Sequence, residues 1–157
     1  MLKYRRIETE IDFAPKIYDS EMRAPRWFRD AFKVWIKSFD EFLMFWKNCA
    51  EIYGLFDDER LLCAVYLEHK AEAYLEIHIS VVASCPNEEL VRYFASLRRL
   101  KFSEGFSAQI GWLVSRNRQM LDVAARAGFV QTGLKMDKRN TNGKVFTWLQ
   151  VAAIHID

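Results

Sequence analysis

The segment from Ser107 to Gly133, SAQIGWLVSRNRQMLDVAARAGFVQTG, constrains the fold more than any other stretch of this chain. Its first apolar side chains alternate with smaller or polar neighbours, which predicts a strand. Asn117 can cap a following helix, because its side chain accepts a hydrogen bond from the free N–H groups of the first turn. Apolar residues then recur at helical spacing as far as Gly128, where a left-handed residue ends the helix. Another extended run begins at Phe129, so the segment predicts strand, helix and strand.

The rest of the chain predicts further strands and helices around this unit. A helical region follows the first strand and is divided by Pro15 and Pro25, because proline interrupts a helix. Residues 51–83 alternate and turn in a way typical of an antiparallel meander of three strands. Asn142-Gly143 is a strong hairpin turn before the last strand. The expected strands cover residues 2–8, 51–56, 61–69, 73–83 and 144–153, and a further helix covers residues 88–105.

An aromatic stretch follows Pro25. Large apolar side chains recur at steps of three and four from Trp27 to Phe39, which predicts a helix with an aromatic face. That face packs in the core against a sheet, or some of its rings stay exposed for a partner, because large aromatic side chains dominate interface cores. A membrane-surface helix is a third interpretation, and the mixed charges along the stretch count against it. The residues concerned are Trp27, Trp35, Phe42, Phe45 and Trp46.

Charge and cysteine usage exclude several classes of function. Twenty-three Lys and Arg face 21 Asp and Glu without a basic block, so nucleic acid is not an expected partner. The three cysteines form no CxxC pair and no zinc spacing with a histidine, so we expect neither disulfides nor a metal site. No signal peptide is visible, and no apolar run approaches the roughly 20 residues needed to cross a bilayer. We therefore expect a cytoplasmic protein without a membrane span.

The spacing of Asn117 and the pair Gly128-Phe129, together with the order of the expected elements, resembles the GNAT acyltransferases. The resemblance covers nearly the whole chain and implies a single domain over residues 1–157. It implies an α/β (α+β) fold with helices on both faces of a mixed, mostly antiparallel sheet, whose fourth and fifth strands splay apart. If the chain is active, the resemblance also implies acetyl-CoA as the cofactor. The candidate acetyl-CoA contacts are Val81, Val82 and Ala83 on the fourth strand, and Asn117 and Met120 on the helix after the fifth.

Two departures from the family pattern count against activity. GNAT enzymes hold the coenzyme A pyrophosphate in a loop of the form Arg/Gln-x-x-Gly-x-Gly/Ala, whose backbone N–H groups close on phosphate at a helix N-terminus. The matching segment here, VVASCPNEELVRYF, has no glycine. Pro86 has no N–H to offer, and Glu88 and Glu89 repel a phosphate. Many members also carry a tyrosine seven residues after the asparagine, which protonates the departing thiolate, and that position is Ala124 here.

The candidate general bases are Glu76 and His78, two residues apart on one face of the fourth strand. GNAT bases often come from this strand, and a carboxylate or imidazole there serves if its pKa lies near the working pH. The alternative is that both residues are simply the polar side of a half-covered strand. Cys85 has no His or Asn at a recognisable spacing, so we interpret it as a structural thiol.

The whole ensemble, a compact GNAT-like chain with a very aromatic N-terminal half and a loop without glycine, resembles phage-encoded GNAT-like head-assembly and internal virion proteins. That implies a virion or host protein as partner, a homo-oligomer as an option, and a location in the host cytoplasm or the particle. The sequence leaves two functions open. One is a GNAT fold with a degenerate acetyl-CoA site used for assembly, which the sequence alone favours, and the other is a divergent acetyl-CoA-dependent N-acyltransferase. Whether the chain is an enzyme is open at this point.

Overall fold

Seven strands form one mixed sheet in the order β1-β2-β3-β4-β5-β7-β6, in a computed structural model that describes residues 2–155. Neighbouring strands are antiparallel except β4 and β5, which run parallel. The strands are β1 Leu2–Arg6, β2 Glu51–Asp57, β3 Arg60–Ala71, β4 Tyr74–Val81, β5 Ala108–Val114, β6 Val130–Arg139 and β7 Val145–Ile154. The helices of the described part are α1 Phe13–Arg23, α2 Arg26–Trp35, α3 Phe39–Asn48, α4 Asn87–Ser103 and α5 Arg118–Arg126. None of the helices in residues 2–155 has the length and apolar character that crossing a membrane requires.

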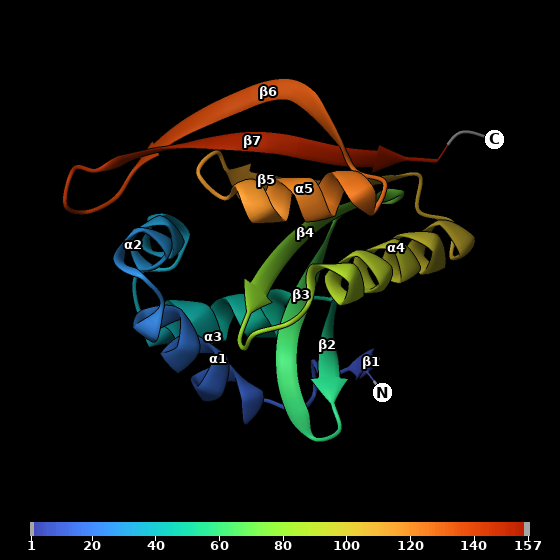
Figure 1. Cartoon of the computed structure of the whole chain (residues 1–157), viewed down its shortest axis with the longest axis horizontal. Helices are drawn as coiled ribbons and strands as arrows, with labels where there is room; N and C mark the ends of the chain where they lie inside the picture. The colour runs from blue at the N-terminus through green and yellow to red at the C-terminus, as the bar shows by residue number, and fades with distance from the viewer. Residues whose placement is uncertain (1, 156–157) are drawn as a thin grey trace.

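Helices α4 and α5 lie side by side on one face of the sheet (Figure 1). Leu90 and Leu97 of α4 and Met120 of α5 are buried against Val65 and Leu75 of the sheet. Side chains alternate between the two faces of a strand, so the apolar residues of β4 on this face begin at Leu75 and continue at every second position. Glu76 and His78 lie between these positions and share the opposite face, as the sequence analysis expected.

Helices α1 and α3 cover the opposite face, where Ile17 and Trp46 pack with Tyr66 of β3. The predicted single aromatic helix after Pro25 is wrong, because the chain forms two helices there. Residue Ile36 leaves α2 in an extended conformation, and the Ser38 side chain starts α3 by accepting a hydrogen bond from the Glu41 N–H.

The aromatic side chains of α2 and α3 divide between core and surface. Phe42 and Trp46 are each 1% exposed, and the Trp46 indole N–H donates to the carbonyl of Glu8 at 3.0 Å. Trp27 and Phe45 are half-buried, whereas Trp35 is 44% exposed. The core interpretation is therefore confirmed for Phe42 and Trp46.

Strands β4 and β5 separate part-way along their length. Their pairing runs from Tyr74 opposite Ala108 to Ile77 opposite Gly111, whereas β4 continues to Val81 and β5 to Val114. The antiparallel pairing of β4 with β3 continues to Val81. The predicted splay between the fourth and fifth strands is therefore confirmed, and its open side belongs to the second half of β4.

Candidate functional site

The splay leaves backbone groups of β4 without a neighbouring strand. The N–H of Val82 donates to the carbonyl of Leu62 at 2.8 Å, on the β3 side. Alternate residues of a strand direct their backbone groups to opposite sides, so the N–H groups of Ile79 and Val81 are directed to the side that β5 has left. The Val81 side chain is 43% exposed there. These two donors can receive the carbonyl groups of an extended ligand.

The other two predicted cofactor contacts, Val82 and Ala83, lie just beyond the end of β4 and are bonded within the protein. The N–H of Ala83 also donates to the carbonyl of Leu62, at 3.2 Å, and the carbonyl of Val82 accepts a hydrogen bond from the Ser20 hydroxyl of α1. Of these three candidates, only Val81 belongs to β4, and its main-chain N–H is the one that is directed into the splay.

The start of α5 is built as the sequence indicated. The Asn117 Oδ1 accepts a hydrogen bond from the Met120 N–H at 3.2 Å, and the Met120 side chain is buried. The helix is followed by Gly128 with a φ of +100°, and a Cβ there would lie 2.7 Å from the Arg98 Nε. The left-handed conformation favours glycine at this position.

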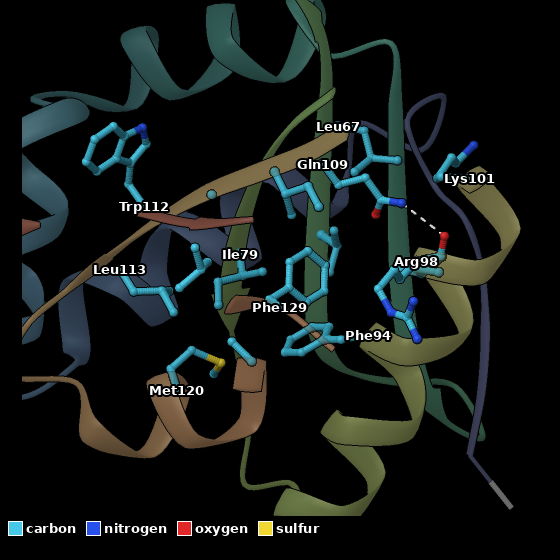
Figure 2. Close-up of a pocket in the computed structure, with 16 residues that line it drawn as sticks. Leu67, Ile79, Phe94, Arg98, Lys101, Gln109, Trp112, Leu113, Met120 and Phe129 are labelled. Carbon is cyan, nitrogen blue, oxygen red and sulfur yellow. Dashed lines mark hydrogen bonds between the residues drawn. The ribbon is translucent and has the colours of Figure 1, made fainter. Parts of the chain in front are cut away.

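A small apolar cavity of about 60 Å³ lies between α4, α5 and the two separated strands (Figure 2). Ile79 of β4 and Leu113 of β5 line it from the two sides of the splay, and Phe94 and Met120 line it from the helices. The amide of Gln109 donates to the carbonyl of Arg98 at 3.0 Å, so this polar group is satisfied. The cavity is too small to enclose a coenzyme, and it leaves room only for a small apolar group. Ala124, the residue in place of the family's tyrosine, also lines it.

The N-terminus of α4 carries negative charge that is partly balanced by α5. Glu88 forms an ion pair with Arg126, and the side chain of Gln119 donates to Asn87 Oδ1 at 2.6 Å. Glu89 pairs with Arg92 at 2.7 Å. Negative side chains in a first turn complement the helix dipole themselves. The structure thus places the Glu88 and Glu89 carboxylates at the N-terminus of α4, as the sequence analysis expected. An ion pair and a hydrogen bond connect this helix end to α5.

Glu68, Glu76 and His78 form a charged cluster on the face of the sheet that α1 and α3 cover. Glu68 lies directly opposite Glu76 in the β3–β4 register, and like charges in that position destabilise a sheet. His78 relieves the repulsion, because its Nε2 lies 2.8 Å from Glu68 Oε1 and 3.3 Å from Glu76 Oε1. Lys70 adds a second positive charge, with its Nζ 2.7 Å from Glu68 Oε2. The three clustered side chains could also hold a metal ion, although their own charges already compensate one another.

These contacts determine the protonation of the two predicted bases. The neighbouring His78 lowers the pKa of Glu68 to about 2 and also lowers the pKa of Glu76. Burial lowers the pKa of His78, but the two carboxylates together raise it by more, so the net shift is upward. A protonated imidazole has no lone pair to accept a proton. The arrangement suits mutual charge compensation better than proton abstraction, and the role of Glu76 or His78 as a base stays a prediction.

Glu21 is a candidate that the sequence analysis missed. It lies on α1 next to Ser20, whose hydroxyl bonds to the end of β4 at 3.0 Å. Ser80 of β4 is a polar neighbour of the Glu21 carboxyl group, and the Tyr66 hydroxyl donates to the Ser80 Oγ at 3.1 Å. Burial raises the pKa of Glu21 to about 7, and the neighbouring Ser80 hydroxyl group opposes that shift. No local sequence signal identifies Glu21, because the packing of α1 against β4 creates its surroundings.

Cys85 lies beyond the end of β4 and is partly exposed. Burial and the neighbouring Glu89 raise the pKa of its thiol, which disfavours the reactive thiolate. These surroundings agree with a structural thiol.

Comparison with solved structures connects this architecture to known proteins. A spermidine N-acetyltransferase SpeG chimera from Vibrio cholerae and hSSAT matches with a TM-score of 0.75 at 14% sequence identity, over 98% of this chain and 95% of that chain. The ribosomal-protein-S5-alanine acetyltransferase from Vibrio fischeri matches with a TM-score of 0.71 at 17% identity, over 99% of this chain and 94% of that chain. A Bacillus subtilis acetyltransferase in complex with CoA matches with a TM-score of 0.69 at 13% identity, over 99% and 100%.

The chain has the GNAT acetyltransferase fold. The GNAT resemblance of the sequence is thereby confirmed at the level of the fold. No protein-family model matches the sequence, and no curated protein matches it. At such low identities a structural likeness establishes the fold alone, and the function has to be argued from the site.

Proposed function

We propose that this chain is a divergent acetyl-CoA-dependent N-acyltransferase. The observation that carries the proposal is the splay, where the N–H groups of Ile79 and Val81 are directed away from β3 toward an edge that β5 does not cover. A ligand with amide groups can add to such an edge as an extra strand would, and the pantetheine arm of acetyl-CoA has amide groups. The full-length match to a GNAT protein solved with CoA supports the same assignment.

The proposed acetyl-CoA site has two parts, the splay and the N-terminus of α4, and they fit the ligand unequally. The splay offers main-chain donors beside apolar side chains, which suits the pantetheine arm. The N-terminus of α4 offers Pro86, which has no N–H, and the carboxylates of Glu88 and Glu89, which repel phosphate. We therefore expect this chain to hold acetyl-CoA mainly through the pantetheine arm, with a small contribution from the pyrophosphate.

Primary amines are the acceptors to test first. Two structural neighbours are named for acetylation of spermidine and of an alanine of ribosomal protein S5. Spermidine and a peptide with an N-terminal alanine are therefore suitable probes, with release of the free CoA thiol as the readout.

Acetyl-CoA should stabilise the folded chain in a way that depends on the splay. A ligand at a hundredfold excess over its Kd stabilises the folded state by about 2.7 kcal/mol, which raises the Tm of a domain of this size by several degrees. Replacing Val81 by Trp fills the opening, so we expect Val81→Trp to abolish the shift. Val145→Trp is the matched control, because Val145 is 49% exposed at the far hairpin of β7.

The control should retain the shift of the wild-type protein. No shift with millimolar acetyl-CoA, together with no CoA release in the presence of either amine, rejects the acyltransferase proposal. An equal shift in the wild-type protein and Val81→Trp places the ligand elsewhere.

An assembly role in a phage particle is the second candidate function. One observation favours it: Trp35 is 44% exposed and Met44 is 65% exposed, beside an open groove of about 450 Å³. The structural comparisons lend it no support, whereas they favour acyl transfer. Assembly through protein contacts therefore ranks behind the enzymatic proposal.

A further inference from the structure

We propose that the acyl site of this chain takes propionyl and butyryl groups in preference to acetyl, an inference that rests on the function proposed above. The site is the apolar cavity of about 60 Å³ between α4, α5 and the splayed strands. Ile77 and Gly111, the last residues of β4 and β5 that pair, both line it. Ile79 and Leu113 line it just beyond, where the strands have separated. The cavity therefore lies at the closed end of the splay.

The direction of the proposed ligand brings its thioester to this closed end. Helix α4 begins soon after β4 ends at Val81, so the helix end that faces the nucleotide lies at the open end of the splay. A pantetheine arm that enters there runs back along β4, and its acyl group comes last. Of the two main-chain donors, the N–H of Ile79 is nearer the closed end, and the Ile79 side chain lines the cavity. A thioester carbonyl that accepts from this N–H has its alkyl tail beside the cavity.

The cavity suits an alkyl group better than water. The polar side chains that line it, Gln109, Arg98 and Lys101, lie together on the side of α4, opposite Met120 (Figure 2). Gln109 donates to the Arg98 carbonyl at 3.0 Å, and the Lys101 Nζ donates to both carboxylate oxygens of Glu51 at 2.7 Å. A buried water needs about two to four polar partners, and apolar cavities stay dry. An alkyl tail that enters leaves water and gains contacts with the lining.

The volume of the cavity sets the length of the acyl group. A cavity of roughly 150 Å³ binds benzene, which has six carbons, so by proportion about 60 Å³ takes a tail of about two carbons. Propionyl and butyryl have tails of two and three carbons beyond the carbonyl group. The acetyl tail is a single methyl group and leaves most of the space empty, whereas an octanoyl tail exceeds it. One methylene group in an apolar pocket changes specificity by roughly 10- to 200-fold.

Ala124 keeps the cavity open on the side of α5. It is 7% exposed, it lines the cavity, and its side chain is a single methyl group. The two extra methyl groups of Ala124→Val would occupy the space of a short alkyl tail. Ala125, the next residue of the same helix, is exposed, so Ala125→Val leaves the cavity unchanged. The structure thus assigns Ala124 as the residue that determines acyl chain length.

The transfer step is the same for every acyl group. The amine nitrogen bonds to the acyl carbonyl carbon, and the carbon–sulfur bond breaks. The amine proton passes to solvent, and the CoA thiolate takes a proton from solvent. The products are the amide and free CoA, so CoA release compares the donors directly.

Steady-state kinetics of the full chain test the preference, with acetyl-, propionyl-, butyryl- and octanoyl-CoA as donors and spermidine or the alanine peptide as acceptor. We expect the kcat/KM of propionyl- and butyryl-CoA to exceed that of acetyl-CoA by about tenfold or more, and octanoyl-CoA to be used poorly. Ala124→Val should reverse the order, so that acetyl-CoA becomes the best donor. Ala125→Val is the matched control and should keep the wild-type order.

Isothermal titration of the protein with the same acyl-CoA series gives a readout that needs no acceptor amine. Butyryl-CoA should bind the wild-type chain about tenfold more tightly than acetyl-CoA, and Ala124→Val should remove that difference. If Ala124→Val proves poorly folded in a thermal scan, Leu113→Ala supplies the opposite change. Leu113 is half-buried at the cavity, and its truncation should move the preferred donor to a longer acyl group.

The outcomes separate the two proposals. No binding of any acyl-CoA and no CoA release by the wild-type chain reject the acyltransferase function, and the acyl site with it. Acetyl-CoA bound and used as well as the longer donors rejects the acyl site and leaves the acyltransferase function standing. An order of donors that is the same in the wild-type chain and in Ala124→Val also rejects the acyl site.

Discussion

Glu21 is a carboxyl group placed where its ionised form is disfavoured, and that placement should affect the stability of the folded protein. Burial raises its pKa from 4.5 to about 7. Because this pKa is raised in the folded state, the stability that the protonated Glu21 carboxyl group contributes is fully present below pH 4.5. It is lost as the pH rises through about 7. The difference of about 2.5 corresponds to on the order of 3 kcal/mol by linkage.

We expect urea denaturation to show this loss as a difference between variants. From pH 4.5 to 8, the free energy of unfolding of the wild-type protein should fall relative to that of Glu21→Gln, which does not titrate. Asp19→Asn should follow the wild-type curve, because Asp19 is exposed on the same helix. Parallel curves for the wild-type protein and Glu21→Gln would contradict the burial of an uncompensated carboxyl group at this position.

Asn117 and Glu21 differ in how well the neighbouring sequence predicts their roles. The role of Asn117 as a helix cap depends on its own backbone neighbours, so the sequence predicted it and the bond to Met120 confirms it. The state of Glu21 depends on Ser80, Tyr66 and the packing of a helix on a strand that is distant in sequence. No neighbouring residue announces such an environment, so a sequence analysis passes over it.

At the scale of the element, the apolar period from Trp27 to Phe39 predicted one helix, yet the chain breaks before Ser38. The missed signal was local. Ser38 followed three residues later by Glu41 is the spacing of a capping box, and the Ser38 side chain does accept from the Glu41 N–H at 3.2 Å. The steps of three and four continue across the break, which is why periodicity alone concealed it.

Two tryptophans of these helices should respond differently to truncation. Trp46 is 1% exposed, so Trp46→Ala should lower the free energy of unfolding by about 3–5 kcal/mol. Trp35 is 44% exposed, so Trp35→Ala should have a much smaller effect on unfolding by urea. If the second candidate function holds, Trp35→Ala should still weaken association with a partner, where hot-spot losses reach about 2 kcal/mol or more. Similar destabilisation by both substitutions would instead make Trp35 a core residue.

At the scale of the whole molecule, the sheet and its splay were predicted from the resemblance to the GNAT acyltransferases, which the order of the expected elements helped to establish. A parallel neighbour for β4 requires a crossover, and the helical pattern of residues 88–105 supplied one. The cavity between the splayed strands and the two helices was beyond prediction, because its size depends on how Phe94, Met120 and Phe129 pack together.

The splay and the N-terminus of α4 should contribute unequally to the binding of acetyl-CoA. Because Glu88 and Glu89 lie where phosphate would bind, the nucleotide half of acetyl-CoA should add little affinity. Acetyl-CoA and acetyl-pantetheine should then bind the wild-type chain with Kd values within about tenfold, or about 1.4 kcal/mol. Replacing both glutamates by Gln removes two charges and frees Arg126 and Arg92 from their ion pairs.

Isothermal titration should therefore show that the double Gln variant binds acetyl-CoA more tightly and acetyl-pantetheine as before. Glu59→Gln, an exposed change in the β2–β3 turn, removes one negative charge away from the site and should alter neither affinity. A wild-type preference for acetyl-CoA of more than a hundredfold would show that the α4 N-terminus binds the pyrophosphate despite its carboxylates. Both the splay and the N-terminus of α4 would then bind the ligand. Arginine side chains of α4 and α5 would contact the pyrophosphate in place of the missing glycine loop.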